Sequence, residues 1–277
     1  MTRQIKQRQC AVVVALLFGA LSGAALAETS NDRYWAQLSG YWASISSSAR
    51  LDFPGTKIPG TSLELEDELG LSDRDVLPAI QIGGRISQNW RMEFEYYSLE
   101  RNGTRSIDRQ INWGDLSFPA SASVTTNFET TIYRVSAGYS FYKTPQAEAG
   151  LVFGLHMTDF VIALSGQASV GGNAASFQSE SKDQLVPLPT LGLYGGYAIN
   201  DKFNLRARLD YFSLNYDDYD GSLMALSAAV DWRFHKNFAA GIGYRYVDYG
   251  LEATKDSFHG EVQYSFSGPT LFLETAF

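Results

Sequence analysis

Cysteine is nearly absent from this sequence. Its 277 residues contain one, Cys10, close to the N-terminus. A disulfide needs two thiols and a thiolate zinc site needs several, so the sequence excludes a disulfide framework and a cysteine-ligated metal centre. Packing and hydrogen bonds must therefore hold the fold.

Positive charge and long apolar runs are also scarce. The chain carries 22 Lys and Arg against 30 Asp and Glu, a net charge of −8. Nucleic-acid binding depends on clustered cations against phosphates, so nucleic acid is excluded as a partner. Only residues 11–21 are almost wholly apolar, which is shorter than the roughly 20 residues that a spanning helix needs. A membrane role would require β-strands.

The N-terminal segment has the three parts of a secretory signal peptide. Three basic residues precede the apolar run, and Ala25-Leu26-Ala27 offers a cleavage site. We expect residues 1–27 to be a signal peptide cleaved after Ala27, with an uncleaved membrane anchor as the alternative. Residues 28–277 would then form one domain with 19 Lys and Arg against 30 acids, a net charge of −11.

Apolar and polar side chains alternate beyond residue 33. In residues 90–105, Met92 and Phe94 share one face, while Glu93 and Glu95 share the other. Period 2 indicates strands with one apolar face. We expect strands at 34–48, 75–86, 90–105, 124–142, 150–165, 184–199, 203–214, 223–234, 238–251 and 258–277. The pattern predicts an all-β fold, a closed antiparallel transmembrane β-barrel of ten strands, with eight or twelve as alternatives.

Short and long connections alternate along the chain. Gln88-Asn89 is a short turn, whereas 49–74, 106–123 and 166–183 are long. This favours short turns and both termini in the periplasm, with the long loops outside. The first long loop holds an acidic run, Glu64 to Leu71. It either packs a short helical turn against the rim or into the barrel mouth, or it faces lipopolysaccharide through bridging divalent ions. The packing residues would be Leu63, Leu65, Leu69 and Leu71.

Aromatic and proline residues give further expectations. The aromatics beside short turns are expected to form the inner interfacial girdle: Trp90, Tyr142, Phe203, Trp232, Phe234 and Phe238. Proline cannot donate a hydrogen bond to a strand ladder. All eight prolines are therefore expected to lie outside the strand middles, near the outer rim or in a periplasmic turn.

The C-terminal residues resemble the assembly signal of outer-membrane barrels, which implies the barrel-assembly machinery as a partner. The signal residues are Leu271, Leu273 and Phe277. Upstream, Tyr264 and Phe266 have the opposite parity. A β-bulge at Ser267-Gly268-Pro269 would restore the apolar face, because one extra residue reverses the register. Otherwise the membrane strand would begin at Pro269.

Together these features resemble a small bacterial outer-membrane β-barrel of the OmpA and OmpW type, within the porin-like superfamily. The resemblance rests on the signal peptide, the alternating strands, the aromatic girdles and the terminal Phe277. It implies a location in the bacterial outer membrane and contact with its lipid and lipopolysaccharide. It does not specify an activity, because one architecture serves many functions, and any surface ligand is unknown.

Strand parity directs a set of charged residues into the lumen. They are Arg85, Arg91, Glu93, Glu95, Arg134, His156, Arg206, Arg208, Asp210, Asp231, Arg233, Arg245 and Glu274. Seven arginines face five carboxylates, with His156 beside them. Buried charges require partners, so one hypothesis is an ion-pair network that fills a narrow barrel. The other is a charged constriction that selects a small anion.

No residue pattern indicates a catalytic set, a metal site or a cofactor. Of three histidines, His259 lies near acids at the expected outer rim, without a recognisable nucleophile motif. Three functions therefore stay open. The first is a structural or surface-interaction role through the outer loops, the second is a narrow channel for small solutes, and the third is a rim or lipid-facing enzyme.

Overall fold

Ten long strands make up most of the protein. The computed structural model describes residues 33–52, 60–113, 116–170, 173–178, 184–216, 219–255 and 258–277. The strands are β1 (Tyr34–Asp52), β3 (Arg74–Arg85), β4 (Trp90–Ser106), β7 (Ser123–Lys143), β8 (Ala147–Val170), β10 (Gln184–Ala198), β11 (Phe203–Tyr216), β12 (Tyr219–His235), β13 (Phe238–Lys255) and β14 (Phe258–Ala276). The expected signal peptide, residues 1–27, and its cleavage after Ala27 lie outside the described residues.

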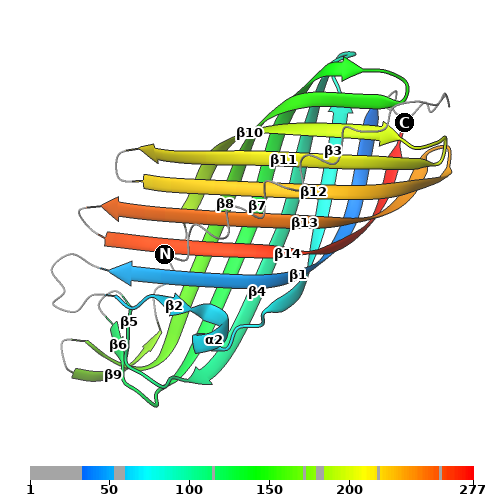
Figure 1. Ribbon diagram of the computed structural model, residues 1–277. Coiled ribbons are helices and arrows are strands. Elements are labelled where there is room, and N and C mark those ends of the chain that lie inside the picture. The colour runs from blue at the N-terminus through cyan, green and yellow to red at the C-terminus, as the bar shows by residue number, and fades with distance from the viewer. Residues whose placement is uncertain are drawn as a thin grey trace, which may run out of the picture.

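The ten strands pair into an antiparallel ring (Figure 1). The order runs β1, β3, β4, β7, β8, β10, β11, β12, β13 and β14, with β8 pairing β10 directly. β14 returns to pair with β1, from Trp35↔Ala276 to Asp52↔His259. The predicted ten-stranded barrel is confirmed, and every predicted strand is found within five residues of its expected bounds.

Smaller elements gather at the end of the barrel that carries the long connections (Figure 1). They are β2 (Leu63–Glu64), α2 (Leu65–Leu69), β5 (Ile111–Trp113), β6 (Leu116–Phe118) and β9 (Asn173–Gln178). The described residues include no helix that is long and apolar enough to span a bilayer.

The outer surface near the short turns is an apolar band. Its large side chains are each between 41% and 66% exposed: Leu38, Ile80, Ile82, Met92, Phe153, Leu191, Leu193, Ile242, Leu271 and Leu273. Their neighbours in sequence point inward: Glu93, next to Met92, and Tyr194, next to Leu193, are 9% and 6% exposed. An outward apolar band around a polar interior is the arrangement that faces lipid.

Arginine at Leu193 tests this lipid-facing band. Leu193 is paired with Leu151 and Leu209 in the strands on either side. Leu193→Arg should lower the free energy of unfolding by about 2–4 kcal/mol, because a guanidinium near the bilayer centre loses its hydration. Urea unfolding in lipid vesicles measures the change. The control is Thr125→Arg, on the exposed outer part of β7, where we expect almost no loss. Equal losses at the two positions would contradict the assignment of the band.

The structure excludes one of the two alternatives for strand β14. Its register with β13 is continuous from Lys255↔Phe258 to Phe238↔Thr275, so the suggested bulge at 267–269 is absent. Tyr264 and Phe266 are therefore turned inward and are 3% and 1% exposed. The parity argument failed because it assumed a polar lumen throughout, whereas the outer half of this lumen is apolar.

The expectation that prolines avoid strand middles is also wrong. Pro78 and Pro269 lie near the middle of β3 and β14, and Pro187 and Pro189 lie in the outer half of β10. Each sits beside an interrupted ladder. β3 pairs with β4 only from Ala79 onward, β10 pairs with β11 only from Leu191 onward, and β1 and β14 skip two pairs beside Pro269. Proline has no backbone N–H, and this is tolerated where no neighbouring strand is in place to accept a hydrogen bond from it.

Candidate functional site

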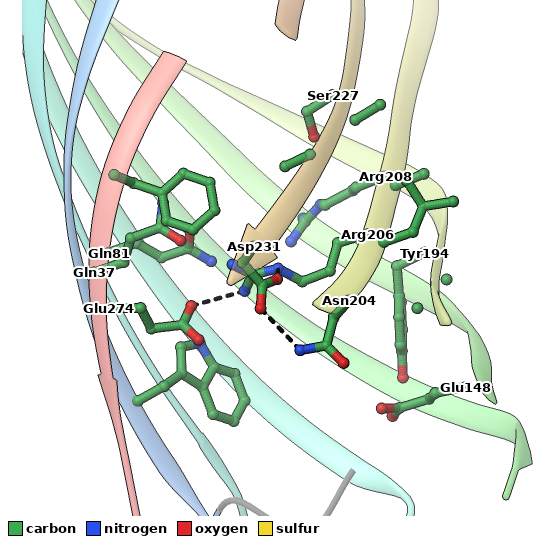
Figure 2. Close-up of a pocket in the computed structure, with 18 of the residues that line it drawn as sticks. Gln37, Gln81, Glu148, Tyr194, Asn204, Arg206, Arg208, Ser227, Asp231 and Glu274 are labelled. Atoms are coloured by element: carbon green, nitrogen blue, oxygen red, sulfur yellow. Dashed lines mark hydrogen bonds and ion pairs between the residues drawn. The ribbon is translucent and has the colours of Figure 1, made fainter. Parts of the chain in front are cut away.

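The lumen has a polar part near the short turns and an apolar part towards the long loops. The polar part contains a cavity of about 250 Å³, hereafter the polar chamber. Its walls include Gln37, Gln81, Tyr194 and Arg206 (Figure 2). It reaches the short turn at Gln146. Alternation along every strand places these side chains inside.

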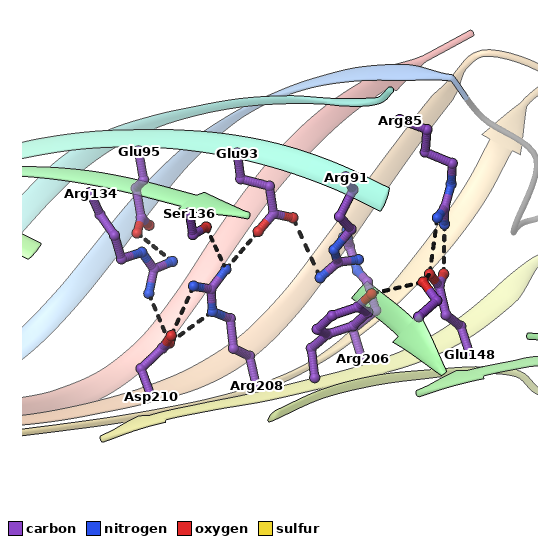
Figure 3. A network of polar contacts seen from close by, with 12 residues as sticks. Arg85, Arg91, Glu93, Glu95, Arg134, Ser136, Glu148, Arg206, Arg208 and Asp210 are labelled. Carbon is purple, nitrogen blue, oxygen red and sulfur yellow. Dashed lines mark hydrogen bonds and ion pairs between the residues drawn. The ribbon is translucent and has the colours of Figure 1, made fainter. Parts of the chain in front are cut away.

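A continuous chain of ion pairs crosses the lumen from β4 through β7 to β11 (Figure 3). Arg134 contacts Glu95 at 2.7 Å and Asp210 at 3.2 Å. Arg208 contacts the same Asp210 at 2.7 Å and Glu93 at 2.6 Å. All five side chains are at most 10% exposed. Shared partners let each charge satisfy several hydrogen bonds, which lowers the cost of burying it.

Two side branches extend this chain. On one side, Arg245 pairs with Glu95. On the other, Arg91 lies 3.5 Å from Glu93 and stacks over the Tyr194 ring, with its guanidinium carbon 3.5 Å from the ring centroid. Cation–π stacking is stronger where water is displaced. These contacts connect β4 with β13 and with β10 across the polar part of the lumen, since neither pair of strands is adjacent in the ring.

A second cluster lies at the rim of the short turns. Arg85 donates two hydrogen bonds to Glu148, at 2.9 and 2.6 Å, and Ser140 also donates to Glu148. The Ser140 hydroxyl is 2.8 Å from the Tyr194 hydroxyl, which connects this cluster to Arg91. Two parallel N–H donors facing one carboxylate form the strongest pairing geometry available to arginine.

Arg206 forms the third cluster and lies next to the chamber (Figure 2). Its guanidinium contacts Asp231 at 2.9 Å and Glu274 at 2.7 Å, and Asn204 donates to Asp231 at 2.9 Å. The Arg206 side chain is 37% exposed, more than any other arginine in these pairs. The same guanidinium lies 5.0 Å from the Phe272 ring centroid.

The paired charges inside the polar part balance among the described residues. The six arginines are Arg85, Arg91, Arg134, Arg206, Arg208 and Arg245, and the six carboxylates are Glu93, Glu95, Glu148, Asp210, Asp231 and Glu274. Sequence reasoning missed Glu148, because it placed residue 148 in a turn, whereas β8 already begins at Ala147. The available signal was that Glu148 has the same parity as Gly150 and Val152, so it lies on the same face of the strand. With Glu148 included, these pairs leave no positive excess for an anion.

The remaining two predicted lumen residues lie at different depths. Arg233 is half-buried near the short turns and donates to the Lys236 carbonyl at 3.2 Å. His156 is 4% exposed and is paired in register with Arg134 on β7 and Leu188 on β10. His156 therefore sits where the polar part meets the apolar part.

The apolar part is filled by an aromatic block of seven residues that sequence reasoning did not anticipate. They come from six strands and are at most 6% exposed: Tyr41, Tyr97, Phe128, Phe160, Tyr249, Tyr264 and Phe266. Their ring centroids lie 5.1–6.5 Å apart in eight tilted or edge-on pairs. Because aromatic side chains from six strands of the barrel pack against one another, they leave little space along the barrel axis.

The first long loop packs against the aromatic block, which agrees with the packed alternative of the two that the sequence left open. Leu63, Leu65 and Leu69 are fully buried and Leu71 is 4% exposed. Helix α2 ends at Gly70, whose φ of 74° is the left-handed conformation that favours glycine at a helix end. The loop thus caps the apolar part from outside.

A buried ion pair fixes this loop. Arg101 on β4 pairs with Glu66 of α2, and the Arg101 side chain is 0% exposed. Ser47 donates to Glu66 through its backbone N–H at 2.9 Å and its hydroxyl at 2.6 Å, and Arg101 donates to the Ser47 hydroxyl at 2.8 Å. Arg101 also lies 4.8 Å from the Phe128 ring centroid, which links the loop to the aromatic block.

The residues expected at the membrane surface lie on the outside of the barrel. The proposed girdle residues are between 41% and 49% exposed: Trp90, Tyr142, Phe203, Trp232, Phe234 and Phe238. The proposed assembly-signal residues Leu271, Leu273 and Phe277 are 52%, 61% and 63% exposed. His259 contacts Thr254 at 2.8 Å and Glu252 at 3.9 Å on the outer part of the barrel.

Residues 13–234 match the family described as the outer membrane protein beta-barrel domain. The chain belongs to this family. It is an outer-membrane β-barrel protein, and membership places it in the bacterial outer membrane. No curated protein sequence matches this member of the family.

A solved structure shares the fold of this outer-membrane barrel, and others are similar to it at lower TM-scores. The outer membrane protease OmpT from Escherichia coli is 12% identical, with a TM-score of 0.57, covering 94% of this chain and 99% of that one. Neisserial surface protein A is 13% identical (TM-score 0.33; 88% and 97%), and the Pseudomonas putida toluene transporter TodX is 10% identical (TM-score 0.33; 92% and 92%). At such identities the OmpT likeness is one of fold alone.

Proposed function

We propose that this protein is a non-conducting outer-membrane barrel with a structural or surface-interaction role carried by its outer loops. The observation behind the proposal is the aromatic block. It closes the lumen above the polar chamber, and the first long loop covers it. A barrel filled by side chains resembles the small members of its class rather than the wide porins.

The ion pairs also argue against transport. An ion entering the polar chamber would meet six arginines already held by six carboxylates. Breaking one pair leaves its partner uncompensated in a region of low dielectric, which is costly. A net positive constriction was one of the two hypotheses from the sequence, but the six arginines and six carboxylates of these pairs provide no surplus charge for it.

Planar-bilayer recording tests this function. We expect purified protein to give no sustained current, because ions would have to cross the aromatic block without water. An open porin measured in the same bilayers shows that insertion and detection work. Heat-modifiable migration on gels verifies that the inserted protein is folded. Stable conductance steps from the folded protein would overturn the proposal in favour of a channel.

A further inference from the structure

The barrel wall is interrupted on one side. Among the described residues, β10 and β11 pair from Leu191↔Tyr211 down to Ala198↔Asn204, and no pairs join 184–190 to 212–216. Both stretches are still strands, since the first pairs with β8 and the second with β12. We call the facing stretches 184–190 and 212–216 the β10–β11 seam.

Apolar side chains take the place of hydrogen bonds at the seam. Leu188 of β10 and Phe212 of β11 both meet at Gly221 of β12, where a Cβ would lie 3.2 Å from the Leu188 side chain and 3.3 Å from the Phe212 ring. Leu188 is 5% exposed. Side-chain contact of this kind is non-directional, so it yields to a guest more readily than a ladder of backbone hydrogen bonds.

Leu214 of β11 is exposed where β10 and β11 do not pair. Leu214 shares the lumenal face with Asp210 and Phe212 by strand alternation. It is nevertheless 49% exposed. Outside the wall, the last ladder pair, Leu191 and Tyr211, is 54% and 56% exposed. An apolar surface therefore continues from the lipid-facing band through the seam to the lumenal face.

The seam begins at the level of the outer membrane surface. β11 starts at Phe203 beside a short turn, and a tilted strand spans the bilayer in about 9–11 residues, which end near Tyr211 to Ser213. The second wall interruption, between β3 and β4, differs because the first long loop covers it. A Cβ on Gly103 of β4 would lie 2.5 Å from the Gly70 carbonyl oxygen.

We propose that the β10–β11 seam admits one hydrocarbon chain of an outer-membrane lipid, which passes between Leu188, Phe212 and Leu214 while its headgroup stays at the membrane surface. A lipid is the occupant because the seam continues the surface that already faces lipid. An added peptide strand fits less well, since Pro187 and Pro189 remove two donors from the free edge of β10.

Photolabelling tests the proposal. The protein is placed in nanodiscs that contain a phosphatidylethanolamine with a diazirine near the end of one acyl chain, and labelled residues are mapped by mass spectrometry. We expect label at Leu188 and Phe212, which point inward, besides the outward Leu191 and Leu193. Label confined to outward residues in the unaltered protein would refute the proposal.

Two variants sharpen the test. Leu214→Glu should reduce labelling of the inward residues at least five-fold, because a carboxylate at the entrance disfavours a hydrocarbon chain. Val76→Glu is the matched control, since Val76 is 47% exposed beside the covered β3–β4 interruption. It should leave the inward labelling unchanged. Equal labelling of the Leu214 variant and the control would also refute the proposal.

Discussion

Replacing Arg208 with methionine should lower the free energy of unfolding by about 3–5 kcal/mol. The Arg208 side chain is 10% exposed and contacts both Glu93 and Asp210. Methionine preserves most of the packing but leaves these carboxylates with fewer compensating charges in the polar part of the lumen. Urea unfolding in lipid vesicles, followed by tryptophan fluorescence, gives the difference.

The control for this prediction is a surface pair. Arg50 contacts Asp52 at 2.8 Å, and the Arg50 side chain is 35% exposed. Arg50→Met should cost less than about 1 kcal/mol, because water replaces the lost contact. Adding Asp210→Asn to Arg208→Met should cost less than the two single changes combined, since each removes the same buried interaction. Additive losses would mean that the two residues are not coupled.

Removing the carboxylate of Glu66 should release the first long loop. In Glu66→Ala, the fully buried Arg101 loses its ion pair, and we expect a destabilisation of about 3–5 kcal/mol concentrated in this loop. Limited proteolysis of the folded barrel measures the effect as faster cleavage within residues 60–73. The loop would open while the ten-stranded ring persists, because its ladders do not depend on α2.

Helix α2 supplies its own control. Glu68 is two residues away and pairs with Arg109 at 2.6 Å, but the Arg109 side chain is 54% exposed. Glu68→Ala should therefore change stability by less than about 1 kcal/mol and leave the rate of proteolysis almost unchanged. Similar cleavage rates for the two variants would show that Glu66 does not fix the loop.

Alternation was sufficient to predict the barrel, because each membrane strand has one lipid-facing and one lumenal side. It placed Glu93, Glu95 and Asp210 inside without any structure. The packed first loop was one of two alternatives for its acidic run, suggested by the leucines within that run and not by strand alternation.

Parity could not predict what lies above the polar chamber. Inward aromatic residues such as Phe128 and Phe266 have the pattern that a lipid-facing side would have, and only the position along the strand distinguishes the two. The interrupted ladders were equally inaccessible. Pro187 and Pro189 indicated that hydrogen bonds are missing from one side of their strand. The sequence could not show that β11 is the strand that is unpaired there, because strand pairing is set by the three-dimensional fold. Arg101 was missed because its partner lies in a loop.

The pairing of β1 with β14 joins segments at opposite ends of the chain, with Trp35 opposite Ala276. Neighbouring strands such as β12 and β13 can form a hairpin as soon as both exist, whereas ring closure must await the last strand. Bringing such distant segments together is slow, because loop-closure entropy is lost before any contact compensates for it. Until then β1 and β14 are free edges able to pair with another chain. Protection of those two edges during biogenesis is thus a kinetic requirement of this fold.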